Sequence, residues 1–250
     1  IQRAVEIAVK KASKVVVKID TLGDLREGFR AKSKKQGVLA KKGFKQAYGP
    51  STGTIVSPDG YIITSSFTLR NKPRHIFVTT DDGRQFVAKL VGQDQSRGIA
   101  LLKVSVEKAL PAVPILAKKD IKAGQFSIAI GYGYGGKSAN VSVGIVSAKD
   151  RISGKALQAS PLISPANYGG VLASIDGRIM GIIVPLTSSG RMAGVDFYDC
   201  GIGFAISRSD LEGLLPRLMR GEDLKAGFLG VMADQKKTDG GITIKEIVRR

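Results

Sequence analysis

Few side chains in this sequence of 250 residues can take part in acid–base or nucleophilic chemistry. His75 is the one imidazole and Cys200 is the one thiol. Hydrolysis by a serine requires a hydroxyl, an imidazole that accepts its proton and a carboxylate that orients the imidazole. The position of His75 therefore decides whether such chemistry is available.

Metal chemistry has no candidate residues. One histidine and one cysteine, with no carboxylates clustered at ligand spacing, predict neither a metal site nor a cofactor. Cys200 cannot form a disulfide within the chain. It lies in the strand-like run YDCGIGFAI without a cationic neighbour in the sequence, which predicts an inert, buried thiol.

Composition and charge limit the class of protein. The chain is 43% hydrophobic and can bury one or two cores, but it lacks the run of about 18 apolar residues that a membrane-spanning helix needs. The sequence does not open on a secretory signal peptide. The net charge of +18 favours nucleic acid, anionic lipid, acidic polysaccharide or an acidic protein as a partner.

Residues 21–50 are predicted to form a long, exposed loop, and part of the charge lies in its basic section at residues 26–45. Its basic residues are Arg30, Lys32, Lys34, Lys35, Lys41, Lys42 and Lys45. Two interpretations stay open: a solvated tether, or a docking site for an acidic partner or polyanion, because adjacent cations release counterions on binding. Phe29 and Phe44 are the only aromatic residues between Leu22 and Gln46, so sequence-specific reading of nucleic acid is not expected.

The elements that would position these residues are mainly strands. Residues 1–13 place apolar side chains at helical spacing and predict a short amphipathic helix. Short β-branched runs separated by turn residues follow between residues 52 and 104, and again between 125 and 206. Two groups of about six strands each predict an all-β fold of barrels.

A second helix is predicted at residues 207–221. Ser209 and Glu212 are spaced as a capping box, and Gly221 is placed to end the helix. Pro216 within this segment predicts a kink.

Several short strings occur in a characteristic order along the chain. They are STGTIVSPDGYIITSS, DDGRQFVAKLVGQDQ, GIALLKV, AGQFSIAIGYGYG, VSVGIVSAKDR, LQASPLISPANYGGVLASIDGRIMGI, GIGFAIS and GFLGV. Together they resemble the trypsin-like protease domain of the HtrA/Deg family, whose members carry C-terminal PDZ domains. The resemblance implies two six-stranded, trypsin-like β-barrels with an N-terminal and a C-terminal helix.

The same resemblance implies a division into domains. A protease-fold domain is expected at residues 1–222, with barrel one at about 14–106, barrel two at about 121–206 and the helix at 207–221. A linker and the truncated start of a PDZ-like domain are expected at residues 223–250.

The resemblance also locates the catalytic triad of the family, and all three positions are replaced. Phe67 stands where the histidine is expected, Gly98 where the aspartate is expected and Tyr168 where the serine is expected. His75 lies eight residues beyond Phe67 on a predicted strand, roughly 25 Å away if extended, so it cannot serve as the base.

Other polar residues near these positions do not restore a triad. Asp94 and Ser164 each lie four residues before a family position, and neither has an imidazole to work with. Two interpretations of Phe67 and Tyr168 stay open. They are drift in a chain that no longer needs catalysis, or they fill the cleft or form an aromatic binding surface.

The oxyanion loop implied by the resemblance contains Ala166, Asn167, Gly169 and Gly170. Ala166 replaces a glycine of the family pattern. Its Cβ is expected to disfavour the φ that the loop requires.

Two glycine-rich strings suggest ligands. GYGYGGKS at residues 131–138 fits the phosphate-loop pattern, but the alternating run after it predicts a strand where that motif needs a helix, so no nucleotide is expected. The string GFLGV resembles the carboxylate-binding loop of PDZ domains, with Gly227, Phe228, Leu229 and Gly230 as its residues. Only 24 residues run from Gly227 to Arg250, so peptide capture is not expected from them.

These observations lead to one main functional prediction and two alternatives. The main prediction is a catalytically inactive pseudoprotease that acts as a scaffold or protein-binding module with a chaperone-like or regulatory role. The alternatives are a serine endopeptidase of the HtrA/Deg family and a polyanion-binding module that uses residues 26–45. The resemblance further implies a periplasmic or other extracytoplasmic location, other proteins as partners and a homo-oligomer.

Overall fold

The computed structural model describes most of the chain. The described residues are 1–22, 51–70, 72–133, 138–187, 199–225, 231–233 and 244–247. Strands dominate, as the short β-branched runs predicted. Among the described helices none is long and apolar enough to cross a membrane.

The first six strands form a closed barrel. They are β1 (Val16–Leu22), β2 (Ser51–Ser57), β3 (Tyr61–Ser65), β4 (His75–Thr79), β5 (Gln85–Asp94) and β6 (Ile99–Val104). The strands pair in the order β5-β4-β1-β2-β3-β6, and pairing of β5 with β6 closes the ring. Along β4 the buried Ile76 and Val78 alternate with the exposed His75 and Phe77, which is the period of a strand with one buried face.

The second barrel is closed in the same way. Its strands are β7 (Phe126–Gly131), β8 (Asn140–Asp150), β9 (Ala156–Ala159), β10 (Val171–Ser174), β11 (Ile179–Val184) and β12 (Gly203–Ser207), in the order β10-β11-β12-β9-β8-β7. All pairings between them are antiparallel. The predicted fold of two six-stranded, trypsin-like barrels with terminal helices is confirmed.

Short elements connect the strands. They are the 3-10 helices η1 (Ser13–Val15), η2 (Ser66–Leu69), η3 (Lys118–Asp120) and η4 (Pro165–Asn167), and the helical turn α3 (Arg151–Gly154). Of these, η2 follows β3 of the first barrel and η4 precedes β10 of the second. These two connections lie next to each other and position the candidate site, because the ring of Phe67 in η2 contacts the ring of Tyr168 directly after η4.

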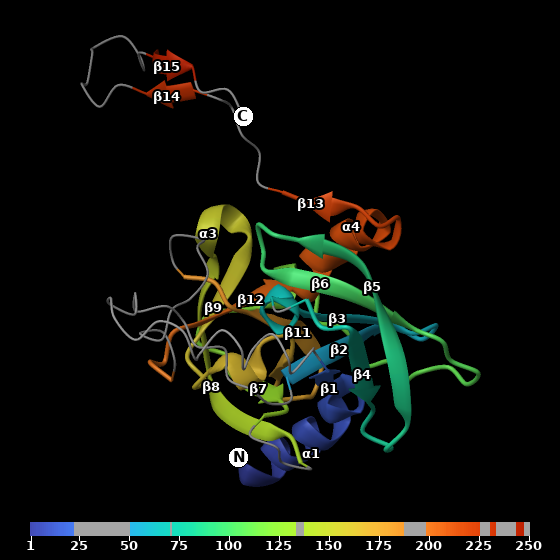
Figure 1. Cartoon of the computed structure of the whole chain (residues 1–250). Coiled ribbons are helices and arrows are strands. Elements are labelled where there is room, and N and C mark those ends of the chain that lie inside the picture. The colour runs from blue at the N-terminus through green and yellow to red at the C-terminus, as the bar shows by residue number, and fades with distance from the viewer. Residues whose placement is uncertain are drawn as a thin grey trace, which may run out of the picture.

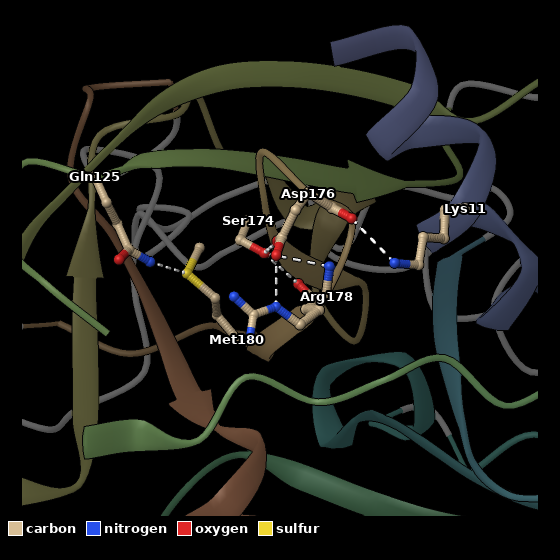
Figure 2. A network of polar contacts seen from close by, with 6 residues as sticks. All are labelled: Lys11, Gln125, Ser174, Asp176, Arg178 and Met180. Carbon is tan, nitrogen blue, oxygen red and sulfur yellow. Dashed lines mark hydrogen bonds and ion pairs between the residues drawn. The ribbon is translucent and has the colours of Figure 1, made fainter. Parts of the chain in front are cut away.

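The N-terminal helix α1 (Gln2–Ala12) agrees with the predicted amphipathic helix. It packs on the second barrel through the buried Ala8 and Ala12. Lys11 at its end donates to the main-chain carbonyl of Asp176 in the β10–β11 turn at 3.1 Å (Figure 2). The Asp176 carboxylate in turn accepts hydrogen bonds from Ser174 and Arg178. Helix α1 therefore contacts a turn that is stabilised by hydrogen bonds between the turn's own side chains.

The C-terminal helix α4 (Arg208–Met219) starts one residue later than predicted and is capped differently. Ser207, rather than Ser209, is the N-cap, and its hydroxyl accepts the Asp210 main-chain N–H at 3.0 Å. The predicted capping box of Ser209 and Glu212 is therefore wrong, because Ser209 already lies inside the helix. Leucines at positions 211, 215 and 218 form the buried stripe of α4.

The chain after α4 returns to the first barrel. Strand β13 (Asp223–Leu224) pairs in parallel with β5, beside α4 (Figure 1). The strands β14 (Val231–Ala233) and β15 (Ile244–Ile247) then form a separate two-stranded hairpin. The predicted boundary at residue 222 and the PDZ-like start stay predictions, and Gly227, Phe228, Leu229 and Gly230 lie outside the described residues.

Two hydrophobic clusters fill the fold. The larger one joins side chains of both barrels, including Ile19 and Ile62 of the first and Ile128 and Ile130 of the second. The smaller one lies in the second barrel and contains Tyr168. Cys200 contributes to neither, because it lies exposed in a turn, so the prediction of a buried thiol is wrong.

Candidate functional site

The three positions singled out in the sequence come together where the two barrels meet. Phe67 lies in η2 and Tyr168 directly follows η4. Their rings stand edge to face, with centroids 6.2 Å apart and planes at 82°. Phe67 is 6% exposed and Tyr168 is 3% exposed. The two rings are thus a buried contact between the barrels and not an exposed aromatic surface.

Gly98 joins this group through the main chain. Its carbonyl accepts the Ser66 N–H at 2.9 Å and the Ser65 hydroxyl at 3.3 Å. The Ser65 hydroxyl oxygen also accepts the Phe67 N–H at 3.1 Å. Gly98 has a φ of +68°, which glycine adopts without strain. Gly98 therefore lies in a turn whose carbonyl is hydrogen-bonded to the start of η2. Because glycine has no side chain, this position holds no carboxylate.

The loop between Ser164 and Gly170 is closed by its own hydrogen bonds. The Asn167 side chain accepts the Ser164 N–H at 3.2 Å, and the Ser164 carbonyl accepts the Asn167 N–H at 2.9 Å. The Tyr168 N–H donates to the Pro165 carbonyl at 3.3 Å. In a trypsin-type site the N–H of the nucleophile position donates to the oxyanion. Here that donor already has an acceptor inside the loop.

Threonines of the first barrel hold this loop from the other side. Thr52 donates its hydroxyl to the Ala166 carbonyl at 2.6 Å, and Thr54 donates to the Gly169 carbonyl at 2.7 Å. The Thr52 hydroxyl oxygen also accepts the Tyr132 N–H at 2.7 Å. These bonds join segments that lie 80 to 115 residues apart. The threonines of β2 thereby fix the position of the loop relative to the first barrel.

Two residues of the loop show why it keeps its shape. Gly169 has a φ of +89°, and a Cβ there would lie 2.3 Å from the Thr52 carbonyl oxygen, so only glycine fits. Ala166, by contrast, has a helical backbone within η4. The expectation that its Cβ strains the loop is therefore wrong.

The family follows from comparison with known proteins. Residues 51–182 match the family model described as a trypsin-like peptidase domain. The chain belongs to the trypsin-like peptidases. Within them its relatives and structural neighbours are HtrA/DegP proteins, as the resemblance implied.

Two curated relatives illustrate the similarity of this HtrA-family chain. The probable periplasmic serine endoprotease DegP-like of Chlamydia pneumoniae is 34% identical over 186 residues, which cover 72% of this chain and 36% of the relative. The periplasmic pH-dependent serine endoprotease DegQ of Escherichia coli strain K12 is 31% identical over 200 residues, which cover 76% of this chain and 42% of the relative. The chain thus spans less than half of the length of either relative.

Solved structures agree with this assignment of the HtrA-family fold. The serine endoprotease from Yersinia pestis superposes with a TM-score of 0.68 and 26% identity, over 97% of this chain and 74% of the other. An AlgW variant of the HtrA type with a tripeptide superposes with a TM-score of 0.73 and 24% identity, over 98% and 76%. The curated relatives are named periplasmic, in agreement with the expected extracytoplasmic location.

The main functional prediction from the sequence does not survive this comparison. An inactive pseudoprotease that acts as a scaffold or binding module is contradicted, because the relatives and structural neighbours are named as serine endoproteases. These names favour the alternative prediction, a serine endopeptidase of the HtrA/Deg family.

His75 lies apart from the contact between Phe67 and Tyr168 in this HtrA-family domain. It is exposed at the start of β4, where it pairs with Leu22 of β1. Its ring contacts Phe77 on the same strand, with centroids 6.3 Å apart. Within the described part of the chain His75 forms no hydrogen bond to a hydroxyl. That His75 does not act as the base of this site stays a prediction.

Asp94 has a structural role in the turn before Gly98. It is fully buried and accepts hydrogen bonds from the Ser96 hydroxyl at 2.6 Å and the Arg97 guanidinium at 2.7 Å. Ser164 lies in the closed loop described above. Among the described residues no hydrogen bond joins His75 to Asp94 or Ser164, and it stays a prediction that these two residues build no triad.

Tyr132 is a residue of the site that sequence reasoning missed. It is 7% exposed and lies beside Thr52. Burial raises the pKa of its phenol, and the nearby charge of Asp81 raises it further, so the hydroxyl stays protonated. The signal in the sequence is the string GYGYGG, whose first tyrosine is Tyr132.

The remaining predicted sites lie partly or wholly outside the described residues. Arg30, Lys32, Lys34, Lys35, Lys41, Lys42 and Lys45 are outside them, as are residues 134–137 of the glycine-rich string. The element after that string is strand β8, as predicted. In the described part of the chain no three potential ligands are grouped to hold a metal ion.

Proposed function

We propose that this chain is part of a serine endopeptidase of the HtrA family. Its proposed substrates are polypeptides outside the cytoplasm. The two-barrel fold and the names of the relatives support this proposal. The single observation that carries it is the family match over residues 51–182, which includes the loop between Ser164 and Gly170.

One observation favours a second candidate, a member of this family without hydrolytic activity of its own. The family's base and nucleophile positions hold Phe67 and Tyr168, whose rings contact each other in a buried setting. Neither ring can take a proton from a serine, and Gly98 offers no carboxylate to orient a base. Loss of a whole triad lowers turnover on the order of 10⁶-fold in a protease of this type.

One experiment separates the two candidates. Purified chain is incubated with unfolded casein, and in parallel with a fluorophosphonate that labels activated serines. Cleavage together with a label on any serine supports the endopeptidase and identifies a nucleophile other than residue 168. No cleavage and no label, with an active HtrA protease cleaving casein in the same buffer, supports the second candidate and contradicts the first.

A further inference from the structure

The first half of strand β8 is paired along one edge only. β8 pairs with β7 over residues 140–145, but it pairs with β9 only at Val146 and Ala148. Within the described part of the chain no other strand pairs with β8. The edge of β8 that faces away from β7 therefore has no partner strand before Val146.

Hydrogen bonds at Ile145 and Val146 show which main-chain groups point to which edge. The Val146 N–H donates to the Gln125 carbonyl, just before β7, at 2.9 Å. The Ile145 carbonyl accepts the Ser160 N–H at 2.9 Å, and the Ile145 N–H donates to the Ser160 hydroxyl at 3.0 Å. The main-chain groups of Val146 thus point toward β7, and those of Ile145 point away from it.

Val141 and Val143 have the same orientation as Ile145. In an antiparallel pair the main-chain groups of alternate residues point to the same edge of the strand. The N–H and C=O groups of these two valines therefore point away from β7. Within the described residues none of these four groups forms a main-chain hydrogen bond on that edge. They are arranged as an unpaired strand presents them.

The segment after β9 does not cover this edge, because it crosses a face of β8. Pro161 has no N–H to donate, and a Cβ added to Gly144 would lie 2.5 Å from the Pro161 nitrogen. The Leu162 N–H then donates to the Ser142 hydroxyl at 2.8 Å. Ser142 and Gly144 lie on one face of the strand, so the segment packs on that face and leaves the edge uncovered.

The opposite face of the same stretch is apolar and accessible. Val141, Val143 and Ile145 are 42%, 44% and 41% exposed. Residues 139–148 contain no charged residue and no proline, which are the features that usually prevent a strand edge from pairing. The edge thus combines free main-chain groups with apolar side chains at every second position.

This combination selects an extended polypeptide as the partner. Main-chain donors and acceptors at strand spacing are complementary to another strand, and exposed side chains beside them contact its alternate residues. A second copy of this chain would carry the same net charge of +18, which disfavours its approach. We propose that the β8 edge at Val141 and Val143 binds an extended apolar segment of another polypeptide, without positive charge, by strand addition. This inference goes beyond the proposed function, because it requires no hydrolysis.

Fluorescence anisotropy on the whole chain tests the proposal. The probe is a short fluorescein-labelled peptide that alternates valine with threonine and carries an aspartate at each end. The control is the same peptide with its central amides N-methylated, which keeps the side chains and removes the N–H donors. We expect the probe to bind and the control to bind about 10- to 100-fold more weakly, because main-chain hydrogen bonds are lost. No binding of the probe, or equal binding of both peptides, overturns the proposal. Mass spectrometry of the recovered probe distinguishes binding from cleavage.

A proline substitution locates the binding at this edge. Val143→Pro removes an N–H that points away from β7, so the β7–β8 pairing is kept, as for proline on other edge strands. It is expected to weaken probe binding about 10-fold or more. Val143→Thr keeps the N–H and the branched side chain and is the matched control, with binding expected near the wild-type level. Wild-type affinity in Val143→Pro would overturn the proposal.

A second variant keeps the test valid if far-UV circular dichroism shows that Val143→Pro does not fold. Val141→Pro removes the other free N–H, near the start of the strand, and is also expected to weaken binding. Its control is Val141→Thr. Light scattering tests a second copy as the occupant. If the wild-type chain binds no probe and a folded proline variant dissociates an oligomer, a second copy occupies the edge and the proposal is wrong.

Discussion

The contact between Phe67 and Tyr168 shows what two substitutions do at the scale of single residues. Both rings are buried, and Tyr168 belongs to the core cluster of the second barrel. Edge-to-face aromatic pairs stabilise a fold by about 0.5–1.5 kcal/mol beyond the area they bury. The ring of Tyr168 thus contributes to packing at the place where a nucleophile would have to be accessible.

Replacing this ring tests that role. Tyr168→Ser removes the ring from a packed core and is expected to lower the free energy of unfolding by about 3 kcal/mol, measured by urea denaturation. Casein cleavage is expected to stay at the wild-type level, because Phe67 supplies no base for the new hydroxyl. Tyr168→Phe keeps the ring and serves as the control. A gain of cleavage in Tyr168→Ser would show that a base is within reach.

The carboxylate of Asp176 leads to a prediction of how thermal stability depends on pH. Burial acts to raise the pKa of Asp176, but hydrogen bonds from Ser174 and Arg178 outweigh it and hold this pKa below its usual value. A lowered pKa in the folded state stabilises the protein above the unfolded value and ceases to do so as the pH falls through the folded value. Asp176→Asn is therefore expected to lower Tm at about pH 6, and this difference should shrink below about pH 4. A difference in Tm independent of pH would contradict the assignment.

The closed loop before β10 illustrates positioning at the scale of elements. Its shape depends on Gly169, which approaches β2 closely, and on the hydroxyls of Thr52 and Thr54. Each buried threonine hydroxyl satisfies a carbonyl that would otherwise lack a donor. The main chain of the loop is therefore held by hydrogen bonds from threonine side chains that do not involve the side chain at position 168.

Two glycine substitutions together measure how much the close approach of Gly169 to strand β2 matters for stability. Gly169→Ala is expected to lower the free energy of unfolding by more than about 2 kcal/mol, because it combines an unfavourable φ with a clash. Gly124 has a φ of +84°, but a Cβ added to it would meet nothing within 4 Å. Gly124→Ala is expected to cost only about 1 kcal/mol. Equal losses in urea denaturation would show that the approach of Gly169 to β2 is unimportant.

The N-terminus of α4 allows a test of which serine caps this helix. Ser207→Ala removes the N-cap hydroxyl that accepts the Asp210 N–H and is expected to cost about 1 kcal/mol of unfolding free energy. Ser209→Ala, the change at the position that the sequence suggested, is expected to cost less. The reverse order in thermal or urea unfolding would restore the capping box inferred from the sequence.

The whole molecule is held together by a core that both barrels share. The larger hydrophobic cluster includes side chains of each barrel, and the helices α1 and α4 cover strands of the second barrel. Neither barrel can lose its packing without exposing side chains of the other. The two barrels therefore form one unit of stability.

This shared core predicts a single unfolding transition. The chain has six tyrosines and no tryptophan, so tyrosine fluorescence reports tertiary structure while far-UV circular dichroism reports strands. We expect the two urea curves to coincide, as in a two-state transition. Separated midpoints would show that the barrels unfold independently.

The fold could be predicted because the pattern of each strand is local. Alternating runs such as the one around Val78 and turn residues between them specify strands, and the ordered strings specified the two barrels. The contact of Thr52 with Tyr132 could not be predicted, because 80 residues separate them and no local pattern in the sequence links the two. The exposure of Cys200 was missed because the strand that follows begins only at Gly203.

The parallel pairing of β13 with β5 gives the C-terminal part of the chain a mechanical connection to the barrel. The Leu224 carbonyl accepts the Gln95 N–H at 2.9 Å, and Leu224 lies beside Asp94 at the head of the turn that leads to Gly98. A tension applied to the chain beyond residue 225 therefore acts first on this short pairing. Because Asp94 begins the turn that leads to Gly98, and the Gly98 carbonyl accepts the Ser66 N–H at the start of η2, a load on that end of the chain acts close to Phe67.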